Sequence, residues 1–122
     1  MNVAYGYHFT DQNSFDQYGA VLPYPMGASH TNEIQYVLND AATFTTNNTH
    51  AGALELSEGM IDYWTNFAKN GDPNGGDLPY WDSFDVYGSM INLNDAGIVP
   101  SNVLEYSNVH NCGYWAAPPL NI

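Results

Sequence analysis

A single apolar stripe constrains the fold of this 122-residue chain more than any other feature. Its large apolar residues recur at steps of four, three and four positions, the spacing of one face of an α-helix: Leu56, Met60, Tyr63 and Phe67. We expect the helix to stop at Gly71, because glycine adopts the left-handed conformation that ends helices, and Pro73 cannot continue the hydrogen-bond ladder. Such a stripe predicts a packed core rather than a cofactor site.

Two shorter segments alternate with the two-residue period of β-strands. Aromatic residues alternate with small or polar ones from Val3 to Phe9, and Met90–Asn94 is a shorter alternating piece. A final helix is expected over about residues 103–114, capped by residues 100–102. Turn-forming and small polar residues dominate the two stretches that we expect to be loops, which are residues 10–26 and 39–52.

A histidine follows a run of small residues between these loops, in the order Gly27, Ala28, Ser29 and His30. Small neighbours allow the backbone to turn sharply and allow other groups to approach the imidazole. Histidine has the unperturbed pKa nearest to neutral pH, so His30 is suited to proton transfer. Glu33 can brace this loop by accepting backbone N–H groups, and the apolar residues after it can anchor the loop to a core.

Two segments resemble the type-B carboxylesterase and cholinesterase family. The loop with His30 and Glu33 resembles the segment that carries the catalytic histidine in this family. Residues 63–74, which read YWTNFAKNGDPN, resemble a helix that follows that histidine by a few dozen positions. Residues 78–82 add a weaker likeness. One departure is Thr31, where the family usually has glycine, because a side chain there restricts the backbone.

The resemblance covers about residues 3–82 and implies an α/β fold. The chain would be the C-terminal fragment of an α/β-hydrolase domain, with the last sheet strand, the catalytic-histidine loop and packing helices, and residues 1–122 would form one partial domain. The family's reaction uses a serine nucleophile, a histidine base, an acid and an oxyanion hole. The resemblance implies that His30 is the base. Because the acid lies upstream of the histidine in this family, Glu33 would support the loop.

The nucleophile of such enzymes normally lies in a Gly-x-Ser-x-Gly turn, and the sequence contains no such motif. Ser29 adjoins His30 without this turn, and Ser57 and Ser89 lack its spacing. We therefore expect the chain alone to be inactive. Its expected partners are the upstream part of the hydrolase domain and, in the complete enzyme, a carboxylic ester. The resemblance implies no cofactor.

Two other classes of function compete with this interpretation. His30 and Glu33 have a spacing that a metal site can use, but no second paired motif of ligands accompanies them. The many Tyr, Trp and Asn residues also fit a non-catalytic module that binds carbohydrate or protein through exposed aromatic rings. A binding module needs at least one of its three tryptophans exposed in a groove: Trp64, Trp81 and Trp115.

The excess of negative charge makes negatively charged partners unfavourable. Thirteen Asp and Glu residues against one Lys or Arg give a net charge of −12, which disfavours nucleic acid and anionic membrane surfaces. No apolar run is long enough to span a membrane, and no signal peptide is visible after Met1. The acidic, Asn-rich and Lys-poor composition is common in secreted proteins, so we expect the full-length form to be secreted.

The sequence also predicts the chemical state or exposure of three further residues. Asn47 opens the sequence Asn-Asn-Thr, a possible glycosylation site in a secreted protein. Cys112 is the single cysteine, and it is either a free thiol or a residue whose disulfide partner is missing. The resemblance favours the second alternative, since cholinesterases pair such a cysteine with one upstream of the catalytic histidine. His50 is expected to be solvated.

Overall fold

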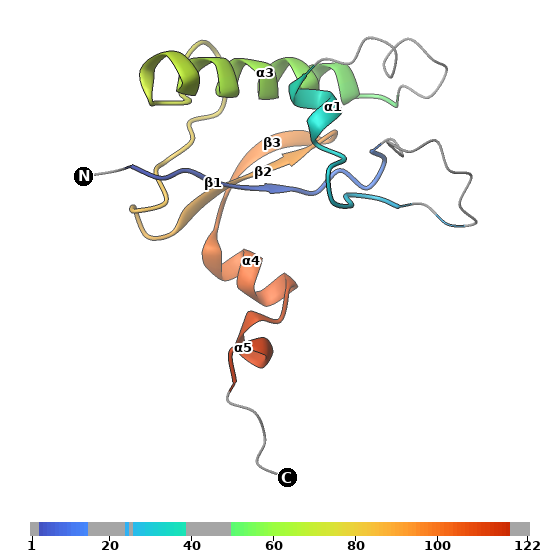
Figure 1. Cartoon of the computed structure of the whole chain (residues 1–122), viewed down its shortest axis with the longest axis vertical. Coiled ribbons are helices and arrows are strands. Elements are labelled where there is room, and N and C mark those ends of the chain that lie inside the picture. Colours follow the sequence, from blue (N-terminus) through green and yellow to red (C-terminus); the bar gives the residue numbers. More distant parts are fainter. Residues whose placement is uncertain (1–2, 15–23, 25, 39–49, 118–122) are drawn as a thin grey trace.

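The computed structural model describes residues 3–14, 24, 26–38 and 50–117 and arranges them around a three-stranded sheet (Figure 1). The elements in chain order are β1 (Gly6–Phe9), α1 (Ile34–Val37), α3 (Ala53–Asn70), β2 (Ser89–Asn94), β3 (Gly97–Asn102), α4 (Val103–Val109) and α5 (Cys112–Trp115). Helices α1 and α3 lie on one face of the sheet, and α4 and α5 extend from the other (Figure 1).

The strand order is β1-β2-β3. Strands β1 and β2 are parallel, and β2 and β3 are antiparallel. The predicted first strand is shorter than expected, because pairing with β2 begins at Gly6 rather than at Val3. The predicted strand over Met90–Asn94 is present, but β3 was not predicted. Pro100 makes β3 a poor strand candidate by sequence, yet an edge strand tolerates proline.

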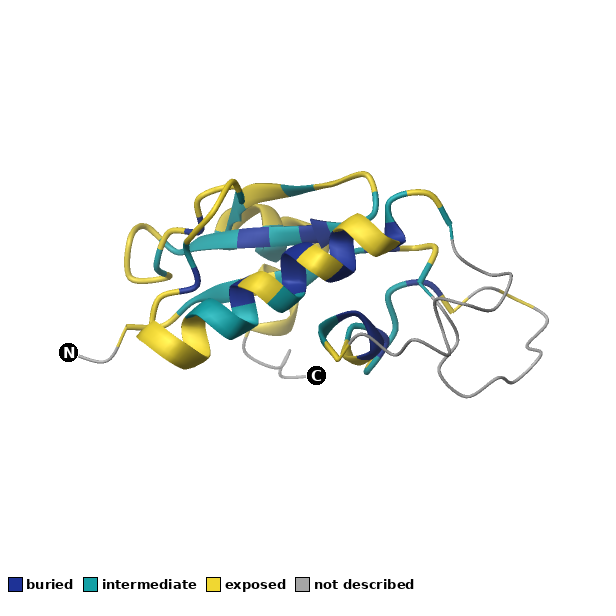
Figure 2. Ribbon diagram, turned by 90° about the horizontal axis from the view of Figure 1, so that it is seen from above, coloured by how far each residue is buried: buried dark blue, intermediate teal, exposed yellow. Residues whose placement is uncertain are grey.

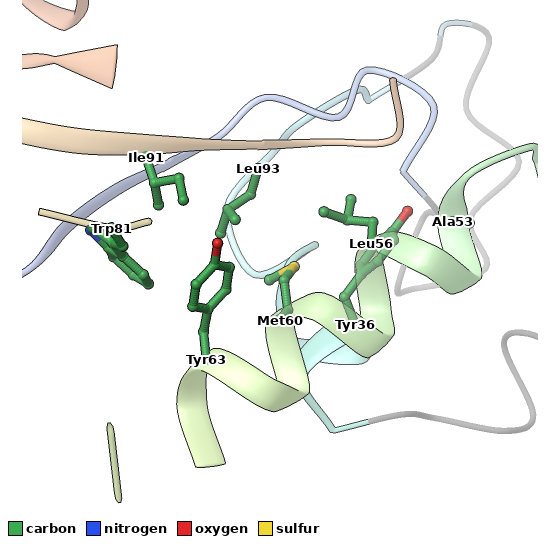
Figure 3. Close-up of a cluster of buried hydrophobic side chains, with 8 residues drawn as sticks. All are labelled: Tyr36, Ala53, Leu56, Met60, Tyr63, Trp81, Ile91 and Leu93. Carbon is green, nitrogen blue, oxygen red and sulfur yellow. The ribbon is translucent and has the colours of Figure 1, made fainter. Parts of the chain in front are cut away.

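Helix α3 confirms the predicted stripe. Its buried residues Leu56, Met60 and Tyr63 pack with Ile91 and Leu93 of β2 in one core cluster (Figures 2 and 3). Gly71 ends the helix at φ 72°, where its N–H donates to the Phe67 carbonyl across 2.8 Å.

The end of the stripe differs from the expectation. Phe67 is 47 % exposed, because the last turn of α3 lies beside an open cleft rather than inside the core. This cleft has a volume of about 190 Å³ and is lined mainly by aromatic rings from β1 and α3 and by Trp81. Figure 2 shows the exposed end of the helix near the N-terminus of the chain.

A turn after α3 holds Trp81 against the sheet. The Asn74 carboxamide accepts a hydrogen bond from the Trp81 N–H at 2.7 Å and donates one to the Trp81 carbonyl at 2.9 Å. The indole N–H of Trp81 donates to the Gly6 carbonyl of β1 across 3.0 Å. Because both polar ends are bonded, the indole can be 95 % buried beside the core.

The C-terminal part forms two helices instead of the single helix predicted over residues 103–114. The Asn102 side chain caps α4 by accepting from the N–H groups of Leu104 and Glu105, as expected from the sequence. Asn111 then adopts φ 52°, which breaks the helix before α5. No residue of either helix is buried. None of the described helices combines the length and apolar character that crossing a bilayer requires.

Candidate functional site

His30 lies in a tight turn between Gly27 and α1. Gly27 has φ 59°, and a Cβ at this position would collide with the side chain of Gln12. The Ser29 N–H donates to the Gly27 carbonyl across 2.8 Å, and the Asn32 N–H donates to the Ser29 carbonyl across 3.2 Å. The small residues predicted to allow a sharp turn therefore do so, and glycine takes the positive φ at its start.

A buried asparagine joins the two sides of this turn. The Asn32 side chain is almost completely buried, and its NH₂ group donates to the Gly27 carbonyl at 2.9 Å and to the Ser14 hydroxyl at 3.0 Å. The Ser14 hydroxyl in turn donates to the same Gly27 carbonyl. Sequence analysis missed both residues. The only local signal was an asparagine beside a glutamate, and the Ser14 contact joins positions 18 residues apart.

Thr31, directly after His30, adopts φ 76°. This left-handed conformation is unfavourable for a β-branched residue. The family-typical glycine at this position would adopt it without strain. The departure noted in the sequence thus coincides with local backbone strain in the turn that carries the candidate base.

The His30 side chain is exposed. Within the described part of the chain, its imidazole has no hydrogen-bond or ion-pair partner. Two of the serines considered as nucleophiles bond elsewhere: the Ser57 hydroxyl donates to the Tyr36 carbonyl, and the Ser89 hydroxyl donates to the Val86 carbonyl. The structure therefore presents an exposed His30 side chain on a turn that hydrogen bonds stabilise.

Glu33 lies at the N-cap position of α1 but makes no side-chain capping bond. Its backbone carbonyl accepts from the N–H groups of Tyr36 and Val37 at 3.1 and 3.2 Å. Burial raises the pKa of Tyr7, and the nearby Glu33 carboxylate raises it further. Both residues line a shallow pocket with Trp64. The loop-supporting role of Glu33 thus stays a prediction, and the side-chain bonds to the turn come from Asn32 and Ser14.

A second cluster lies behind the turn and overturns the expectation that His50 is solvated. The His50 Nε2 atom is 3.3 Å from Asp11, and its Nδ1 atom is 3.1 Å from Asp95. Asp11 is fully buried, and Tyr36 donates to it. Burial, followed by the hydrogen bond to Asp11, raises the pKa of Tyr36. The cluster ties the loop after β1 to the start of α3 and to the β2–β3 turn.

The same cluster is the one place among the described residues where three metal-type ligands converge, since their donor atoms lie within 4.8 Å of one another. Both ring nitrogens of His50 already face carboxylates of this cluster. His30 and Glu33 are not part of this group, so the described geometry gives no support to a metal site built on them.

The remaining predicted residues lie away from the His30 turn or outside the description. Cys112 is a free, partly exposed thiol at the start of α5. Asn47 lies outside the described residues. Of the three tryptophans, Trp115 is 76 % exposed, Trp64 is half-buried beside the aromatic cleft, and Trp81 is buried.

Comparisons with known proteins match most of the chain. The profile of the Carboxylesterase family matches residues 1–115. A medium-chain fatty acyl-CoA hydrolase precursor from Anas platyrhynchos is 35% identical over 85 residues, which are 70% of this chain and 14% of the relative. Cocaine esterase from Homo sapiens is 34% identical over 90 residues, which are 74% of this chain and 16% of the relative. Bile salt-activated lipase from Rattus norvegicus is 33% identical over 100 residues, which are 79% of this chain and 16% of the relative.

The fold agrees with the sequence relatives. The structure of a thermophilic PNB esterase superposes with a TM-score of 0.65 at 20% identity, over 88% of this chain and 21% of the esterase. The α/β prediction is confirmed. The chain spans only 14% to 16% of the length of the three relatives named above. It belongs to the carboxylesterase family and has the fold of part of an α/β-hydrolase domain.

Proposed function

We propose that this chain is the C-terminal segment of a carboxylic ester hydrolase and supplies His30 as the general base of a Ser-His-acid triad. The observation that carries the proposal is the exposed imidazole, which has no partner among the described residues, on a turn held by Asn32 in a chain of the carboxylesterase family. The nucleophile, the acid and the oxyanion hole would come from the remaining part of the hydrolase domain.

In this reaction His30 transfers two protons, one in each half of the reaction. It takes the proton of the serine hydroxyl while the serine oxygen attacks the ester carbonyl, and it gives that proton to the departing alkoxide, which leaves as an alcohol. It then takes a proton from water as the resulting hydroxide attacks the acyl-enzyme. That proton returns to the serine oxygen, and the carboxylic acid is released. Both steps need a ring nitrogen that the serine hydroxyl and a water can reach, and the exposed imidazole of His30 supports this role.

The remaining part of the hydrolase domain is the proposed partner. Strand β1 lies at an edge of the sheet, and the aromatic cleft opens beside it. A strand edge that no described strand pairs with, next to exposed aromatic rings, is a surface that a continuing sheet would cover.

We also propose that the complete protein is secreted and glycosylated at Asn47. Treatment with a glycosidase that removes N-linked glycans should then make the protein migrate faster in a denaturing gel.

The test is kcat/KM for p-nitrophenyl butyrate in the complete hydrolase that carries this segment. His30→Ala should lower it by about 10³–10⁶, as knockouts of a triad member do. The matched control is Ser29→Ala, which removes a hydroxyl from the same turn and should leave the activity unchanged. Near wild-type activity of His30→Ala would refute the assignment. The 122-residue chain alone should hydrolyse the ester no faster than free imidazole does.

A non-catalytic binding module is the second candidate, and the aromatic cleft is the observation that favours it. Such a module would bind an oligosaccharide or a peptide through the rings of Tyr7 and Trp64. Titrating the chain with oligosaccharides while monitoring tryptophan fluorescence would test this directly. Saturable quenching that is lost in Trp64→Leu would support the module, and the absence of any response would favour an internal hydrolase surface.

A further inference from the structure

Two histidines meet on the face of the sheet opposite α3. His8 lies in β1, and His110 directly follows α4. Their Nε2 atoms are 3.1 Å apart, although the residues are 102 positions apart in the chain. Neither residue belongs to the His30 turn or to the cluster of His50, so this pair is unused by the proposed function.

Ring packing holds the pair in place. The Tyr106 ring lies edge to face against His8, with the ring centroids 5.1 Å apart, and it lies 4.3 Å from the ring of His110. Tyr106 and His110 are four positions apart, so they occupy neighbouring places on one side of α4. The two imidazoles are therefore oriented by a shared aromatic neighbour rather than placed by chance on flexible side chains.

A polar group without a good partner lies beside the pair. Asn92 is the register partner of His8 on β2, and its Oδ1 atom is buried without a hydrogen bond of good geometry in the described part of the chain. Because directly paired residues of neighbouring strands project on the same face of a sheet, the Asn92 carboxamide lies beside the His8 side chain. A histidine that binds a metal usually donates its other ring N–H to an oxygen, and the unbonded Asn92 oxygen is a nearby acceptor for this.

We propose that His8 and His110 form a binding site for a divalent transition-metal ion that prefers imidazole ligands, such as zinc, nickel or copper. Two nitrogens at about 2.0–2.1 Å from a tetrahedral zinc ion lie about 3.3 Å apart. The observed separation of 3.1 Å is close to this value, so the pair needs little movement to chelate one ion. Because His110 is exposed, water can occupy the remaining coordination positions.

The metal would tie α4 to the sheet. No residue of α4 is buried, and its apolar side chains Leu104 and Val109 are largely exposed, so burial contributes little to its docking. A bond from His110 through the ion to His8 would connect this helix directly to β1. Magnesium and calcium would not substitute, because they prefer oxygen ligands and this pair offers two nitrogens.

The test is calorimetric titration of the full 122-residue chain with zinc chloride, followed by its thermal unfolding with and without zinc. We expect one zinc ion per chain and a rise in Tm that EDTA reverses, because an ion that binds only the folded state stabilises it. His8→Gln and His110→Gln should each weaken zinc binding by at least about tenfold, since each removes one of two ligands. Magnesium chloride should produce no shift.

Matched variants separate this site from other ligands in the chain. His30→Gln removes one histidine elsewhere, Cys112→Ser removes the only thiol, and His50→Gln disrupts the carboxylate cluster, and all three should retain zinc binding. Nitrogen-15 NMR of the wild-type chain provides a readout that needs no variant, because zinc should shift the Nε2 resonances of two histidines. If the two histidines only share a hydrogen bond, zinc should neither bind to them nor shift their Nε2 resonances. Equal zinc binding in the double variant H8Q/H110Q would also overturn the proposal.

Discussion

The hydroxyl of Tyr36 donates a hydrogen bond of 2.6 Å to the carboxylate of Asp11, and both side chains are fully buried. Tyr36 belongs to α1, the helix that follows the His30 turn, and Asp11 belongs to the loop after β1. His50 joins the pair, with its Nε2 atom 3.1 Å from the phenol oxygen. A buried carboxylate is stable only when its oxygens are bonded, so this contact fixes α1, and with it the His30 turn, against the sheet.

The first prediction concerns that hydrogen bond. Tyr36→Phe should lower the free energy of unfolding by about 1.5–3 kcal/mol, because it removes a donor to a buried charged group and keeps the ring. Urea unfolding measures the difference. The matched control is Tyr87→Phe, which removes the same hydroxyl from a side chain that is 96 % exposed and should have no effect. Equal stability of the two variants would show that the Asp11 carboxylate does not depend on Tyr36.

A second prediction concerns the strained turn. Thr31→Gly should raise the free energy of unfolding by up to about 1 kcal/mol, because relief of a strained backbone conformation outweighs the extra chain entropy of glycine. Thr31→Ala is the matched variant, since it also removes the hydroxyl and methyl groups but keeps the Cβ that causes the strain. Thermal unfolding of both variants and of the wild type measures the difference in stability. If alanine stabilises the chain as much as glycine does, the φ of 76° is not the source.

Alkaline pH should destabilise the fold through Tyr63. Burial raises the pKa of this phenol from 10.0 to about 12 in the folded chain. Above pH 10 the unfolded chain loses a proton that the folded chain keeps, so this contribution to stability is complete below pH 10 and is lost as pH rises to about 12. The measurement is the free energy of unfolding between pH 8 and 12 for wild type and Tyr63→Phe. Parallel curves would contradict the prediction.

The turn itself provides a fourth prediction, about catalysis in the complete hydrolase. Asn32→Ala removes two hydrogen bonds that hold the two sides of the turn and should lower kcat by up to about 100-fold, because small displacements of a catalytic group are costly. Glu33→Gln should have a smaller effect, since Glu33 makes no capping bond. Both are expected as positioning residues, so KM should change less than kcat. A larger loss in Glu33→Gln would restore Glu33 as the main support.

Local chemistry explains why some elements were predicted from the sequence. The stripe and the stop at Gly71 each depend on residues within a few positions, and α3 formed and ended accordingly. The cap at Asn102 is equally local, and it was also predicted correctly. The break at Asn111 was missed, because asparagine is compatible with a continuing helix and only its φ of 52° reveals the interruption. Strand β3 was missed because its formation depends on pairing with β2.

The sequence by itself determined the family, the main helix and the position of the candidate base, because those follow from residue order and short spacings. Only the tertiary structure placed Asn32 and Ser14 on the Gly27 carbonyl, surrounded His50 with Asp11 and Asp95, and brought His8 to His110. Apart from the bond between Asn32 and Gly27, these contacts join segments far apart in the chain. No local pattern encodes them, since each arises where the packing of helices on the sheet brings separate loops together and their polar groups bond to one another.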